Sequence, residues 1–138
     1  MRSIFATLTL FGILSLVLAA CGGAGAPTPT PASPGAQISL TTNPNPPQIG
    51  NVELIVMVND ANGQPIADAE VYVFADHTDM QGMNMNGKAT AQGNGRYAIT
   101  ADFSMSGQWK VTLQVRGAPP PGGKTPLNVT QDFDLELK

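Results

Sequence analysis

Charged side chains, histidine and cysteine are scarce in this sequence of 138 residues. Charged residues make up 12% of the chain, and it has one histidine and one cysteine. A lone histidine supplies no nucleophile–base–orienter set, and the sequence has neither an H-E-x-x-H motif nor a Gly-rich phosphate loop. The net charge of −3 leaves no basic stripe for nucleic acid. We therefore expect neither an enzyme nor a nucleic-acid-binding protein.

Residues 1–20 have the layout of a secretory signal peptide. The segment Met1-Arg2-Ser3 is basic, Ile4–Ala20 carries no charge, and small residues come last. The following Leu18-Ala19-Ala20-Cys21 resembles the lipobox of bacterial lipoproteins. That resemblance implies cleavage before Cys21, a diacylglyceryl thioether on its sulfur, and acylation of the new amino terminus. The alternative is an uncut membrane anchor with a free thiol.

Lipidation of Cys21 would use the only thiol in the chain. It excludes a disulfide, blue or binuclear copper centres, iron–sulfur clusters and c-type haem attachment, all of which need cysteine. Two or three acyl chains anchor a protein firmly. We therefore expect a protein held by its lipid on the extracytoplasmic face of the cell membrane.

Residues 21–36 read as a tether. Gly22–Pro34 has the sequence GGAGAPTPTPASP, with no large apolar side chain to support a core. Alternating proline favours extended polyproline II structure, so we expect a semi-rigid stalk that lifts a domain at 37–138 off the membrane.

Residues 37–138 alternate apolar and polar side chains with a period of two. About seven short strands, separated by turn residues and without helical periodicity, predict an all-β, immunoglobulin-like antiparallel β-sandwich. We expect a monomer, with Trp109 and Met57 in the core. Asn86-Gly87 predicts a two-residue hairpin turn.

Methionine is concentrated in two polar connections. The segment from Asp76 to Gly87 holds Met80, Met83, Met85 and the only histidine, His77, and Met105 lies in the turn Ser104–Gly107. Successive antiparallel strands place both connections at one end of the sandwich and Met57 at the other. Four thioethers and one imidazole are therefore expected to converge.

Thioether sulfur is soft and uncharged, which favours copper(I) over Zn²⁺ or Mg²⁺, and imidazole also suits copper. The candidate metal ligands are His77, Met80, Met83, Met85 and Met105. An alternative stays open, because methionine also fills irregular gaps and forms adaptable surfaces. His77 continues the parity of Val71, Val73 and Ala75 and could cap the rim of the core.

Several motifs resemble the YtkA-like domain family, which is related to FixH-like proteins. They are the D-x-x-G-x-P-x-x-x-A-x-V run from Asp60 to Val71, Met83-Asn84-Met85, Gly95-Arg96-Tyr97 and the run Phe103–Trp109. The resemblance covers about Gln37 to Val115. It implies an immunoglobulin-like sandwich, often linked to copper handling or cytochrome oxidase assembly, and Met83, Met85 and Met105 match the family's methionine positions.

Two functions follow from this sequence. The first is a lipid-anchored copper(I) carrier or scavenger that serves a copper-accepting membrane protein. The second is a metal-free scaffold module that docks a membrane-protein partner through its methionine-rich end.

Overall fold

The computed structural model describes residues 28–29, 35–120 and 122–138. The predicted signal peptide, the predicted lipidation site Cys21 and most of the predicted tether lie outside these residues. Within the described part of the chain, no helix is long and apolar enough to cross a membrane.

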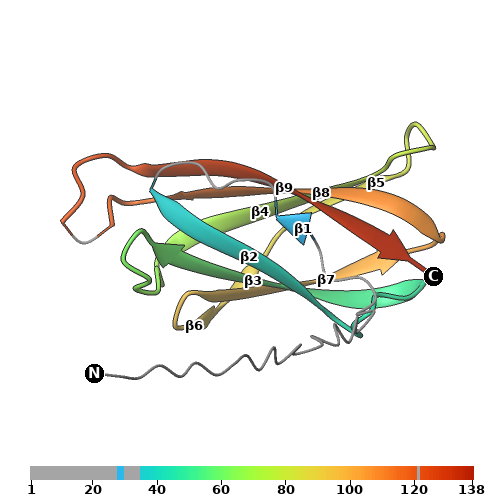
Figure 1. Ribbon diagram of the computed structural model, residues 1–138, viewed down its shortest axis with the longest axis horizontal. Coiled ribbons are helices and arrows are strands. Elements are labelled where there is room, and N and C mark those ends of the chain that lie inside the picture. The colour runs from blue at the N-terminus through green and yellow to red at the C-terminus, as the bar shows by residue number, and fades with distance from the viewer. Residues whose placement is uncertain (1–27, 30–34, 121) are drawn as a thin grey trace, which may run out of the picture.

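The fold is a sandwich of two antiparallel sheets (Figure 1), which confirms the predicted all-β class. One sheet has the order β1-β9-β8-β4-β5 and the other β2-β3-β7-β6. The strands are β1 Thr28–Pro29, β2 Ala36–Asn43, β3 Gly50–Asp60, β4 Ala69–His77, β5 Asn84–Lys88, β6 Thr90–Gly93, β7 Arg96–Phe103, β8 Gly107–Gly117 and β9 Leu127–Leu137.

Strands β5 and β6 form one extended run that changes sheets at Ala89. β5 pairs with β4, whereas β6 pairs with β7 in the opposite sheet. Ala89 is buried, and its N–H donates to Val71 O at 2.8 Å. The predicted hairpin turn at Asn86-Gly87 is wrong, because both residues pair with β4 inside β5 and the chain reverses earlier, between His77 and Asn84.

Every second side chain along the strands points between the two sheets, and these apolar side chains form the core. Val52, Leu54, Val56 and Val58 of β3 are all fully buried. Trp109 is 3% exposed, which confirms its predicted place in the core. The expectation for Met57 is wrong. It has the opposite parity to its buried valine neighbours, so it lies half-buried on the outer face of its sheet.

The strand registers define two ends of the sandwich. Gly50 pairs with Phe103, and Gly107 pairs with Leu137, so the connections 44–49, 78–83 and 104–106 lie at the end where β9 finishes. We call this the methionine end; it is on the right in Figure 1. Met57 pairs with Arg96 at the start of β7, towards the opposite end.

Candidate metal centre at the methionine end

His77 joins the two methionine-bearing connections. It is the last residue of β4 and pairs with Trp109 of β8. Its side chain is 8% exposed, so it lies almost entirely within the protein. One ring nitrogen, Nε2, lies 3.1 Å from the carbonyl oxygen of Ser106 in the β7–β8 connection. The other, Nδ1, accepts the N–H of Asp79 in the β4–β5 connection at 3.2 Å.

These two contacts fix the tautomer of the ring. Because Nδ1 accepts a hydrogen bond from the Asp79 N–H, it carries the lone pair, and Nε2 carries the hydrogen that it donates to Ser106 O. Neutral imidazole binds a metal through a lone pair. For His77 to become a ligand, either its bond from Asp79 or its bond to Ser106 must open.

Hydrogen bonds from β4 and β8 also fix the main chains of the β4–β5 and β7–β8 connections. His77 N–H donates to Met83 O at 2.9 Å, and Trp109 Nε1–H donates to Met105 O at 3.3 Å. Thr78 donates through its N–H and its hydroxyl to Gln108 O, at 2.9 and 3.1 Å. The backbone around Met83 and Met105 is therefore fixed by the His77–Trp109 pair of neighbouring strands, through carbonyl oxygens and not through the thioether groups.

Gly107 lies against the His77 ring, at a position where a larger residue would collide with the ring. Its φ is +122°, and a Cβ placed there would lie 2.8 Å from His77 Nε2. Both features favour glycine, because a side chain would be strained and would displace the ring. The Gly107-Gln108-Trp109 run thus provides room for the imidazole and then the aromatic surface against which it packs.

The methionine side chains differ in exposure. Met83 and Met85 are half-buried and pack against the core, Met105 is half-buried, and Met80 is 43% exposed. Ser104 Oγ donates to Met83 Sδ at 3.8 Å, which places the Met83 sulfur beside the residue that precedes Met105. The structure thus brings Met83 and the Met105 connection together and leaves Met80 at the exposed part of the β4–β5 connection.

Met85 lies on the side of β5 that faces the opposite sheet. A Cβ on Gly87 would lie 2.5 Å from Ile99 Cδ1 of β7, so this side of β5 faces the opposite sheet. Met85 shares that side, two residues away.

On the outer face of the same strand, Lys88 forms an ion pair with Glu70 of β4. The hydrogen bond between them is the largest cause that lowers the pKa of Glu70 and raises that of Lys88, and their opposite charges act in the same directions.

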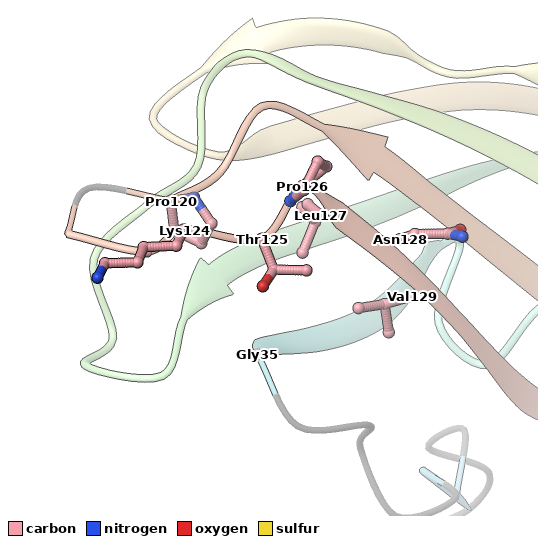
Figure 2. A pocket seen from close by; sticks show the side chains of 9 residues that line it. Gly35, Pro120, Lys124, Thr125, Pro126, Leu127, Asn128 and Val129 are labelled. Carbon is pink, nitrogen blue, oxygen red and sulfur yellow. The ribbon is translucent and has the colours of Figure 1, made fainter.

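Two other kinds of site come into question in the described parts of the chain: a metal site built from His, Cys, Asp or Glu, and a ligand cavity. Across residues 28–29, 35–120 and 122–138, no three His, Cys, Asp or Glu side chains form a group that could hold a metal ion. A cavity of about 360 Å³ lies at the opposite end, beneath the loop before β9 (Figure 2). Glycine, proline, the polar Thr125 and Asn128 and the apolar Leu127 and Val129 line it, and Lys124 is its one titratable side chain.

Sequence reasoning placed the two connections together but missed what joins them. The hydrogen bonds made by Ser104, Ser106 and Gln108 depend on backbone geometry that no local pattern encodes. The parity of His77 with Val71, Val73 and Ala75 did indicate an inward-facing ring. The Gly107-x-Trp109 spacing was the other usable signal, since a glycine two residues from a core aromatic indicates a close approach.

The fold and this end define a class: a small immunoglobulin-like β-sandwich with methionines on the connections at one end. Residues 32–114 match the family described as YtkA-like, and the chain belongs to that family. No match was found among curated proteins or among solved structures.

Proposed function

We propose that this protein is a lipid-anchored extracytoplasmic domain that binds copper(I) through thioether sulfur at its methionine end and acts as a carrier or scavenger. The observation that carries the proposal is the meeting of two methionine-bearing connections, with Met83 Sδ 3.8 Å from the hydroxyl of Ser104, next to Met105. The ligand set would be Met80, Met83, Met85 and Met105, with His77 as a fifth candidate.

The donor chemistry supports copper(I) in particular. Neutral thioethers bind a soft monovalent ion without gathering like charges, and they discriminate against Mg²⁺ and Ca²⁺, which prefer oxygen. Thioethers also form no disulfides in an oxidising compartment, where thiolate sites are vulnerable. The fixed backbone of Met83 and Met105 would reduce the ordering that binding requires.

Copper(I) titration tests this proposal directly. The unlipidated chain from residue 21 should carry Cys21→Ser, because a free thiol would itself bind copper(I). Competition against a chromogenic copper(I) chelator, under reducing conditions, should give about one ion per chain, and silver(I) should serve as a redox-inert substitute. Replacing Met83, Met85 and Met105 together by Leu should abolish binding while leaving the fold intact, since Met-to-Leu changes conserve volume.

The chain supplies a matched control for that triple variant. Met57 lies on the outer face of β3, away from the methionine end, so Met57→Leu removes a thioether without touching the site. Its affinity should equal that of the parent chain. Unchanged affinity in the triple variant would overturn the proposal.

Lipid anchoring needs its own experiment. Mass spectrometry of the membrane-extracted protein should give a mature chain that begins at Cys21 and carries diacylglycerol and an acyl group. Cys21→Ser should release the protein from the membrane fraction. Recovery of an uncleaved chain with a free thiol would favour a membrane-spanning anchor instead.

A metal-free docking module is the second candidate function. Met80 and Ile49, both at the methionine end, are 43% and 53% exposed. This candidate takes the two side chains as parts of one apolar contact surface, and contiguous apolar surface is what marks interaction sites. This candidate predicts that copper(I) is lost to a weak chelator, whereas a membrane-protein partner is captured and is lost in a Met80→Ser, Ile49→Ser variant.

A further inference from the structure

The first strand lies on the outer edge of β9. Thr28 pairs with Asp134 and Pro29 with Phe133, antiparallel, which makes β1 the outermost strand of its sheet. These residues belong to the segment 21–36 that the sequence predicts to be a tether. Within that segment, Thr28 and Pro29 pair with the folded domain.

The proline pattern suits an outermost strand. In the sequence, Pro27, Pro29 and Pro31 alternate with Thr28 and Thr30. An edge strand directs only every second N–H towards its neighbour, and proline, which has no N–H, is tolerated where that group would face solvent. Of the two paired residues only Thr28 has an N–H to offer Asp134, and Pro29 has none to offer a further strand.

The direction of β1 has a consequence for the anchor. β9 runs towards the methionine end and β1 runs the opposite way, so the N-terminal side of β1 points to the methionine end. Cys21 precedes Thr28 by seven positions in the sequence, a reach of about 24 Å. Leu137 lies three residues beyond Asp134, about 10 Å, whereas Leu127 lies seven residues the other way, about 24 Å.

We propose that pairing of β1 with β9 turns the methionine end towards the membrane that holds Cys21. With β1 paired, the seven-residue spacing between Cys21 and Thr28 is long enough to pass the methionine end, but at full extension it only just spans the distance to the opposite end. This orientation rests on the proposed lipid anchor. It identifies the partner as a protein embedded in the same bilayer, whose own soft ligands would meet the thioethers at the membrane surface.

The exposed apolar side chains agree with that orientation. Among the described residues, three large hydrophobic side chains are exposed, and two of them, Ile49 and Met80, lie at the methionine end. The third, Phe74, lies on the outer face of β4. The end directed at the bilayer is thus also the end equipped for an apolar contact.

Depth-dependent fluorescence quenching tests the orientation. The full lipidated chain is placed in phosphatidylcholine vesicles that contain a nitroxide-labelled lipid. Because lipidation uses Cys21, a fluorophore can be attached uniquely to Ser106→Cys at the methionine end or to Lys124→Cys at the other end, both exposed positions. Ser106→Cys should be quenched several-fold more strongly; equal quenching, or stronger quenching of Lys124→Cys, would overturn the proposal.

A matched pair of variants tests the strand pairing itself. Thr28→Pro removes the N–H that faces β9, whereas Thr28→Val keeps it. Hydrogen exchange around Phe133 and Asp134 in the full chain should rise in Thr28→Pro only, and the quenching difference should disappear with it. Identical exchange in the two variants would refute the pairing.

Neither readout uses copper, so a failed copper titration leaves the orientation standing and removes only the assignment of soft ligands to the partner. An unlipidated Cys21 overturns the orientation, and the exchange experiment still measures the β1–β9 contact.

Discussion

The ring of His77 lies edge-on to Trp109, with centroids 5.1 Å apart and an interplanar angle of 77°. Trp109 in turn lies edge-on to Phe103 at 4.9 Å and 78°. This three-ring arrangement connects the last residue of β4 through the core of β8 to the end of β7. The surface connections on either side of it, 78–83 and 104–106, are therefore positioned by buried aromatic packing.

Substitution of His77 should separate its packing role from its hydrogen bonds. His77→Phe keeps a ring against Trp109 but loses the bonds to Ser106 and Asp79, and should lower the free energy of unfolding by about 1–3 kcal/mol. His77→Ala also leaves a cavity and should cost about 1–2 kcal/mol more. Urea denaturation of the two variants measures both costs.

The same variants decide whether His77 is a ligand. Since both ring nitrogens are engaged in hydrogen bonds, we expect His77→Phe to change copper(I) affinity less than about tenfold. A larger loss, of the size seen in the triple methionine variant, would show that the ring opens its bonds to bind the ion.

Gly107→Ala should destabilise the methionine end by two separable effects. Its added Cβ meets His77 Nε2 at 2.8 Å with φ at +122°, whereas a Cβ at Gly50 meets nothing within 4 Å at a φ of +110°. Gly50→Ala therefore reports the backbone strain alone, about 1 kcal/mol or more. We expect Gly107→Ala to cost about 1–2 kcal/mol beyond that.

A double-mutant cycle identifies the source of the excess. In a His77→Ala background the clash partner is gone, so the excess cost of Gly107→Ala over Gly50→Ala should vanish. Persistence of the full excess would mean that another neighbour, and not the imidazole, limits this position.

Trp109 should report metal binding optically. It is the only tryptophan, and its indole N–H donates to Met105 O. Binding of silver(I) or copper(I) by the Met105 thioether would alter this bond and place a heavy ion near the ring. Trp109 emission should therefore change during titration and level off near one equivalent, and Met105→Leu should reduce the response while Met57→Leu keeps it. A response unaffected by Met105→Leu would contradict this placement.

The fold was predictable from sequence where alternation and turns agree. Val52, Leu54, Val56 and Val58 alternate with polar or half-buried neighbours, and burial follows that pattern. Met57 shows where hydropathy alone fails as a predictor. Its position in the alternation directs its side chain to the outer face of the sheet, although the side chain is apolar. For the candidate site, topology alone placed residues 78–83 and 104–106 at one end, but the hydrogen bonds around His77 depend on tertiary geometry.

Asn86-Gly87 was misread for a related reason. The pair favours a type I′ turn locally, yet Asn86 pairs with Phe74 and Gly87 with Val73 inside β5. The absence of a side chain at Gly87 instead leaves room for the end of the Ile99 side chain from the opposite sheet. Long-range packing thus overrode a short-range turn preference.

Gly87→Ala tests that explanation. The new Cβ would lie 2.5 Å from Ile99 Cδ1, the far end of a flexible side chain, so Ile99 must rotate or β5 must shift, at a cost of about 1–2 kcal/mol. Ile99→Val removes Cδ1 and should itself cost about 0.5–1.5 kcal/mol. In the double variant the costs should be less than additive by about 1 kcal/mol, since the valine makes room for the added methyl group. Thermal or urea unfolding of the four proteins gives this coupling energy directly. If Gly87 were instead required for a turn, the Ile99→Val change would give no relief, and the two costs would simply add.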